Sequence, residues 1–128
     1  PCMITGSDNI IEAIEKHLNI TMGETSADGM ITLGEMECMG CCVNAPMIVV
    51  SDYSNPPQYS YDYYEDLTVE RSIEIIDSLR KGVKPAIGSQ IGRQWSAPLG
   101  GKTSCLEPPR GPYCRSLEPP KQPEQQKK

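Results

Sequence analysis

The sequence predicts an α/β chain, α+β in some schemes, with an open sheet flanked by two helices. Apolar residues recur at helical spacing in two segments, one near the start of the chain and one that ends at Gly82. Short runs of strand character lie between these segments. After Gly82, where eight of the twelve prolines lie, the charge turns positive. We therefore expect a domain over residues 1–82 and an extended or disordered, basic, proline-rich tail over residues 83–128.

The first predicted helix covers residues 8–18. Ile10, Ile14 and Leu18 share one face at helical spacing, which is typical of a helix that packs on a core. The one histidine of the chain, His17, falls beside that face. We interpret it as a residue at the solvent boundary rather than a metal ligand, and a single histidine excludes a two-histidine Rieske centre.

Two strand-like runs surround a loop rich in cysteine. Residues 31–37 alternate imperfectly between apolar and polar, so we expect a strand that ends just before Cys38. Residues 47–50 are apolar and β-branched, which predicts a buried strand after the loop. Residues 51–58 are predicted to form a loop, because Pro56-Pro57 is incompatible with a helix or a ladder.

A further strand and a second helix follow. Residues 59–63 alternate tyrosine with polar side chains, the pattern of an edge strand. The second helix is predicted to begin after Thr68, which suits the N-cap, and to end near Gly82, which suits the position after the C-cap. Pro85 lies just beyond and cannot continue the helix.

Three cysteines lie within five residues of one another: Cys38, Cys41 and Cys42. A disulfide between Cys38 and Cys42 would close a very tight loop, and adjacent cysteines rarely pair. A soft metal centre fits better, because it needs several thiolates from one loop. Cys2 supplies a further thiol from a distant segment.

Composition narrows the possible functions. Residues 1–82 carry 4 Lys/Arg and 14 Asp/Glu, whereas residues 83–128 carry 8 and 3, so an acidic domain argues against nucleic-acid binding by the folded part. No apolar run approaches membrane-spanning length. Six cysteines are too few for a disulfide scaffold, and their clustering indicates a reducing compartment and a metal. Cys105 and Cys114 lie in the tail, apart from the predicted site.

Four stretches carry a resemblance to a known family: PCMITGSDNIIEAIEKHL, MECMGCCVNAPM, YYEDLTVE and GGKTSCLEPPRGP. They resemble the thioredoxin-like [2Fe–2S] ferredoxins, and within them the branch found in mitochondrial NADH:ubiquinone oxidoreductase, respiratory complex I. The resemblance covers most of residues 1–112, and CxxxC followed by VNAPM is its most specific part. It implies a thioredoxin-like open sheet whose first strand is missing from this chain.

In that family four cysteines hold the cluster, spaced as C-x4-C and then C-x3-C. Carried over to this sequence, Cys2 is the second ligand of the first pair, and Cys38 and Cys42 are the later pair. The fourth ligand is expected five residues before Cys2, upstream of Pro1. Cys41 falls where the family usually has a small residue, so it is not carried over as a ligand.

The resemblance implies an electron-transfer subunit with no substrate pocket of its own, an enzyme only as part of its complex. A [2Fe–2S] cluster on this chain would lie close to the FMN of a partner flavoprotein subunit, which binds and oxidises NADH. The implied partners are that subunit and other complex I subunits, in the peripheral arm on the matrix side of the mitochondrial inner membrane. Neither nucleic acid nor direct membrane insertion is implied.

The sequence departs from the family in three places. The first strand and fourth cysteine are absent, the region Ser51–Tyr61 is longer than usual, and Tyr113–Lys128 does not continue in the family's manner. A processed or incomplete chain, a splice variant or a divergent gene product would each account for these departures.

Other functions stay open on the residues alone. Three thiolates and one outside ligand suit a structural zinc site, although C-x3-C is unusual for zinc. A metal-free assembly module would use only its helices and tail as contacts. Thiol catalysis of the thioredoxin kind ranks last, because Cys38-Met39-Gly40-Cys41 runs into Cys42 and a turn instead of a helix.

Overall fold

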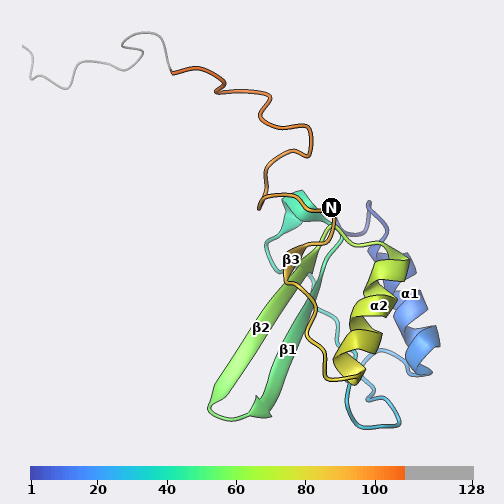
Figure 1. Ribbon diagram of the computed structural model, residues 1–128. Helices are drawn as coiled ribbons and strands as arrows, with labels where there is room; N and C mark the ends of the chain where they lie inside the picture. The colour runs from blue at the N-terminus through green and yellow to red at the C-terminus, as the bar shows by residue number, and fades with distance from the viewer. Residues whose placement is uncertain (109–128) are drawn as a thin grey trace, which may run out of the picture.

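The computed structural model describes residues 1–108, in which two helices lie beside an open sheet (Figure 1). The elements, in chain order, are α1 (Ser7–Leu18), the 3-10 turn η1 (Cys42–Asn44), β1 (Ile48–Asn55), β2 (Gln58–Glu65), α2 (Val69–Arg80) and β3 (Gly88–Ser89). The sheet order is β1-β2-β3, with β1 antiparallel and β3 parallel to β2. The predicted α/β class, an open sheet with two helices, is confirmed.

Helix α1 confirms the prediction for residues 8–18 to within one residue. It starts after Gly6, whose φ of 102° is left-handed, and ends at Asn19, which takes a φ of 54°. His17 lies at its edge, with Nε2 2.7 Å from Oδ1 of Asp77 on α2. The contact ties the two helices together at the surface.

Helix α2 also has the predicted boundaries. The Oγ1 atom of Thr68 accepts a hydrogen bond of 3.2 Å from the backbone N–H of Arg71, which satisfies a donor of the first turn. After the last turn, Gly82 adopts a φ of 72°. Both ends therefore follow from the local sequence.

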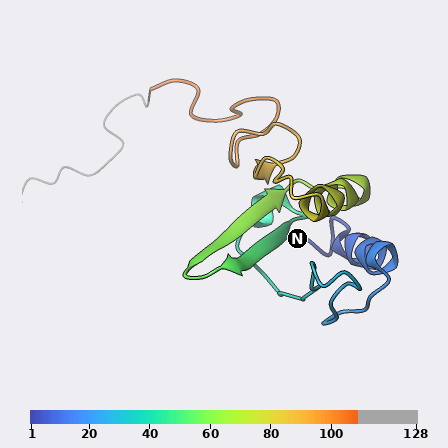
Figure 2. The same cartoon turned by 60° about the horizontal axis from the view of Figure 1, so that its bottom comes forward.

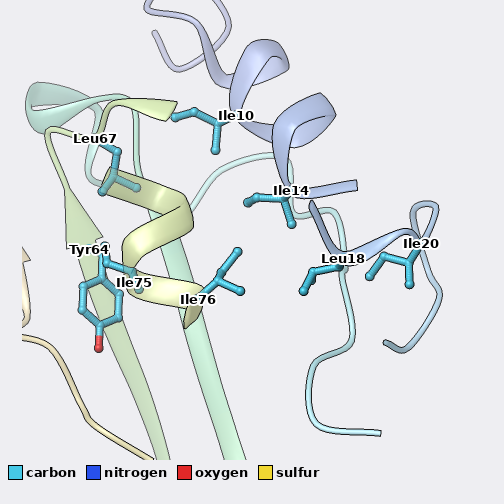
Figure 3. Packing of buried hydrophobic residues seen from close by; sticks show 8 residues of the cluster. All are labelled: Ile10, Ile14, Leu18, Ile20, Tyr64, Leu67, Ile75 and Ile76. Atoms are coloured by element: carbon cyan, nitrogen blue, oxygen red, sulfur yellow. The ribbon is translucent and has the colours of Figure 1, made fainter. Parts of the chain in front are cut away.

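The core lies between the two helices and the sheet (Figure 3). Both helices contribute apolar side chains, β2 contributes one tyrosine, and the segments that follow α1 and β2 add one each. The buried cluster consists of Ile10, Ile14, Leu18, Ile20, Tyr64, Leu67, Ile75 and Ile76. Burying each aliphatic side chain contributes about 1.5–3 kcal/mol, so this cluster makes a large contribution to the stability of the fold.

Strands β1 and β2 form a hairpin whose tip extends beyond the helices in both views (Figures 1 and 2). The strand expected over residues 59–63 is confirmed as part of β2. The loop expected over residues 51–58 is wrong, because β1 continues to Asn55 and pairs with Gln58 across the turn. Pro56-Pro57 occupies that turn, where the missing N–H groups interrupt no ladder.

The strand expected over residues 31–37 is also wrong. Only an isolated bridge joins Thr32 to Thr25, and from Gly34 to Cys38 the chain has no strand partner. Ile31 and Leu33 nevertheless pack against the core. The alternation in this segment reflects which side chains are buried. A strand also requires a neighbouring strand that pairs with its backbone, and this segment has none within residues 1–108.

The segment after α2 returns to the sheet. Gly88 and Ser89 pair with the end of β2, and the guanidinium of Arg93 forms an ion pair of 3.0 Å with Asp66. The boundary between domain and tail at residue 82 stays a prediction, and the segment that returns to the sheet lies after that boundary. The end of the predicted tail, residues 109–128, lies outside the described residues, Cys114 included. No helix within residues 1–108 is long and apolar enough to cross a membrane.

Candidate metal centre

The cysteine loop lies at one end of the sheet, just before β1. Gly40 takes a φ of 86°, which turns the chain between the cysteines, and η1 follows over Cys42–Asn44. The N-terminus lies at the same end of the sheet in both views (Figures 1 and 2). The fold therefore brings the first and the later cysteine segments to one end of the domain.

Cys38 and Cys42 are the pair of thiols that the loop brings together. Their Sγ atoms are 3.8 Å apart, and both residues are exposed. A tetrahedral centre with metal–sulfur bonds of about 2.3 Å, the length in zinc thiolates, places two of its sulfurs about 3.8 Å apart. The spacing of this pair thus fits two ligands of one metal.

Hydrogen bonds make the two thiols unequal. The backbone N–H of Gly40 donates to the Cys38 sulfur over 3.4 Å, and this bond, with a second from the Cys42 thiol, lowers the pKa of Cys38. The bond to Cys38 and the charge of Cys38 raise the pKa of Cys42. The N–H of Gly40 therefore favours the thiolate form of Cys38, and the thiolate is the form that binds metal.

Cys2 lies nearby but does not join the pair. Its charge is among the causes that raise the pKa of Cys42, and its carbonyl accepts a hydrogen bond of 2.9 Å from the N–H of Ser7, the first residue of α1. Within residues 1–108 no group of three or more His, Cys, Asp or Glu side chains is placed to hold a metal ion. The structure brings together two of the three predicted ligands, and the full set stays a prediction.

Cys41 faces a different neighbour. Its thiol donates to Oε1 of Glu65 over 3.6 Å, and Oε2 of the same carboxylate accepts a bond of 2.6 Å from Nδ2 of Asn44. Burial, and then the negative charge of Glu65, raises the pKa of Cys41. Cys105 is exposed.

Asn44 and Glu65 are the residues of this site that the sequence did not reveal. Asn44 is 3% exposed, and its Nδ2 also donates to the carbonyl of Trp95 over 2.8 Å. Its backbone carbonyl accepts from the N–H of Asp66 over 2.7 Å. The only signal in the sequence was the Asn-Ala-Pro turn, since the partners lie too far along the chain for local spacing to predict them.

The donor set suits an iron–sulfur cluster. Thiolates are the ligands that hold such clusters, and a backbone N–H directed at a ligand sulfur is one of the contacts that tunes them. Cys38 and Cys42 provide two thiols at the surface with that N–H in place. The chemistry of the loop therefore fits iron–sulfur ligation.

Comparison with known proteins gives consistent results. The model of the family described as thioredoxin-like [2Fe-2S] ferredoxin matches residues 1–80. The chain is 44% identical over 115 residues to NADH dehydrogenase [ubiquinone] flavoprotein 2, mitochondrial, of Dictyostelium discoideum, a match that covers 90% of this chain and 43% of that protein. It is 44% identical over 80 residues to one subunit of the NADH-quinone oxidoreductase of Rickettsia conorii, with 62% and 42% covered. The corresponding subunit of Rhizobium meliloti is 37% identical over 110 residues, with 84% and 37% covered. The chain spans less than half the length of each of these relatives.

Proposed function

Because this chain belongs to the thioredoxin-like [2Fe–2S] ferredoxin family, we propose that it is an electron-transfer component that holds a [2Fe–2S] cluster. Cys2, Cys38 and Cys42 are its ligands in this proposal. The observation that carries it is the distance of 3.8 Å between the Cys38 and Cys42 sulfurs within a C-x3-C segment. A fourth thiolate is expected from a cysteine upstream of Pro1 in a longer form of the protein.

The proposal extends to the complex in which the cluster works. The relatives are named as components of NADH dehydrogenase or NADH-quinone oxidoreductase, and one of them as mitochondrial. By that likeness the chain works in the NADH-oxidising module of complex I, on the matrix side of the inner membrane. Its partner there is the flavoprotein subunit that carries FMN and binds NADH, and the chain has an oxidoreductase role only within this assembly.

The residues of the loop have separate tasks in this function. A [2Fe–2S] cluster, when bound, supplies one-electron transfer. The Cys38 and Cys42 thiolates bind iron, and the N–H of Gly40 stabilises negative charge on the Cys38 sulfur. Helix α1 begins five residues after Cys2, and the positive end of its dipole favours an anionic group nearby. The exposure of both loop cysteines leaves the site open to a docked partner.

Anaerobic reconstitution with iron and sulfide tests the proposal. A longer form that contains a cysteine five residues before Cys2 is expected to bind iron and acid-labile sulfide in equal amounts. The 128-residue chain alone is expected to be colourless or to bleach in air, because it supplies at most three of the four carried-over thiolates.

The same analysis separates the alternatives. Stoichiometric zinc without acid-labile sulfide in the longer form contradicts the proposal and favours a structural zinc module. Absence of both metals after reconstitution favours a metal-free assembly module. A stable brown protein from the 128-residue chain contradicts the proposed ligand set, because a fourth ligand would then come from this chain itself.

A further inference from the structure

Two cysteine spacings compete in the loop. Cys38 and Cys41 form a C-x2-C segment, and Cys38 and Cys42 form a C-x3-C segment. Both spacings occur in loops that bind metals through thiolates. Spacing alone does not decide whether Cys41 or Cys42 pairs with Cys38, so the decision has to come from the structure around the loop.

The structure separates the two candidate thiols. The Cys42 sulfur is 3.8 Å from the Cys38 sulfur, while the Cys41 thiol donates to Glu65, on the strand end behind the loop. Cys38 and Cys42 are exposed, whereas Cys41 is half-buried. Adjacent side chains leave the backbone in different directions. The Cys42 side chain meets Cys38, and the Cys41 side chain meets Glu65.

Glu65 is held rigidly enough to fix the direction of the Cys41 thiol. It is the last residue of β2, its backbone pairs with Ser89, and its carbonyl accepts a hydrogen bond of 2.9 Å from the N–H of Gln90. Its carboxylate is oriented by the bond of 2.6 Å from Nδ2 of Asn44. One oxygen is thereby used by Asn44, and the other faces Cys41.

We propose that Glu65 is a positioning residue that holds the Cys41 thiol away from the metal, so that Cys42 rather than Cys41 pairs with Cys38. The inference rests on the proposed metal function of Cys38 and Cys42. Glu65 acts through the Cys41 thiol and is not itself a proposed ligand, and Asn44 assists by fixing the carboxylate. The contact with Glu65 explains how a loop with three thiols presents two of them.

The test begins with the metal-free full chain and a thiol-alkylating reagent, with each cysteine followed by peptide mass spectrometry. In the unchanged chain Cys41 is expected to react more slowly than Cys38 and Cys42. Glu65→Ala is expected to raise the Cys41 rate several-fold. Glu65→Met retains most of the side-chain volume but removes the carboxylate. It is therefore expected to raise the Cys41 rate as well, which separates loss of the contact from formation of a cavity. Cys105, which is exposed and lies outside the cysteine loop, serves as the internal standard.

Two control variants accompany these changes. Glu65→Gln keeps the size of the side chain, but it offers one oxygen to the two donors and removes the charge that raises the pKa of Cys41, so it is expected to raise the Cys41 rate by less than Glu65→Ala does. Glu37→Ala removes the same charge from an exposed residue beside Cys38 and is expected to leave the Cys41 rate unchanged. An equal rise in all four variants would overturn the inference, and so would no rise in Glu65→Ala and Glu65→Met.

A second arm adds Zn²⁺ as the probe. In the unchanged chain Zn²⁺ is expected to protect Cys38 and Cys42 from alkylation and to leave Cys41 reactive, and in Glu65→Ala Cys41 is expected to join the protected set. Protection of Cys41 in the unchanged chain overturns the positioning role alone. Absence of any protection in the unchanged chain overturns the inference, because the pairing of Cys38 with Cys42 on a metal is its premise, whereas the cluster proposal is decided by reconstitution of the longer form.

Discussion

The core between the helices and the sheet differs from the cysteine loop in what holds it together. Ile75 and Tyr64 are 0% exposed, and the core around them is almost entirely apolar. The loop exposes Cys38 and Cys42 and is anchored through hydrogen bonds of one asparagine and one glutamate. The first region is stabilised by burial of many side chains and the second by a few directional contacts.

This difference separates stability from function in the molecule. Loss of one core side chain is expected to destabilise the whole domain, because small single domains unfold cooperatively. Loss of one polar contact in the loop is expected to alter the position of the thiols with a smaller effect on global unfolding. Mutations in the two regions therefore distinguish the fold from the site.

The largest effect is expected from the core. Ile75→Ala creates a cavity at a side chain that is 0% exposed and is expected to lower the free energy of unfolding by about 2–5 kcal/mol. Urea denaturation followed by circular dichroism measures the change. Ile87→Ala, at a residue that is 61% exposed, is the matched control and is expected to change it by less than about 0.5 kcal/mol. Similar losses in both variants would show that Ile75 is not part of the core.

An intermediate effect is expected at the anchor of the loop. Asn44→Ala leaves the carbonyl of Trp95 and Oε2 of Glu65 without the donor that Nδ2 supplies, which is expected to cost about 1–3 kcal/mol. The alkylation rate of Cys41 is expected to rise as well. Asn55→Ala, at the exposed hairpin tip, removes a single hydrogen bond to Gln58 and serves as the control. If Asn44→Ala matched this control in both measurements, the loop would be anchored by other contacts.

The smallest effect is expected at the surface contact between Asp28 and Arg80. Hydrogen bonds from Ser26, Met30 and Arg80 lower the pKa of Asp28 from 3.8 to about 2. A carboxyl group whose pKa is lower in the folded state stabilises the fold above pH 3.8 and loses that contribution as the pH falls towards about 2. Asp28→Asn is therefore expected to flatten the dependence of stability on pH between these values. An unchanged slope in acid-unfolding curves contradicts this account.

The comparison also explains which parts of the fold could be predicted. Helices α1 and α2 were predictable because apolar residues recur with the helical period in each of them, such as Ile10 and Ile14 in α1. The signals at the ends of both helices are also local in the sequence. The expected strand over residues 31–37 failed, because Ile31 and Leu33 alternate as buried residues without a paired strand beside them. In sequence, burial periodicity is visible and backbone pairing is not.

The site could be predicted in the same partial way. The resemblance selected Cys38 and Cys42, and the structure places their sulfurs together. The contacts of Cys41 with Glu65 and of Asn44 with Trp95 join segments 24 and 51 residues apart, which local spacing does not encode. The sequence therefore indicated the thiols but not the groups that orient them.

The most direct test of the central claim compares Cys42→Ser with Cys41→Ala, after anaerobic reconstitution, in a form of the chain extended to carry a cysteine five residues before Cys2. Visible absorbance and the content of iron and acid-labile sulfide are measured for both variants. Cys42→Ser is expected to abolish or strongly weaken cluster binding, because it removes a proposed ligand 3.8 Å from Cys38. Cys41→Ala is expected to retain the cluster, because that thiol is bound to Glu65. Equal loss of absorbance in the two variants would contradict the assignment of the ligands.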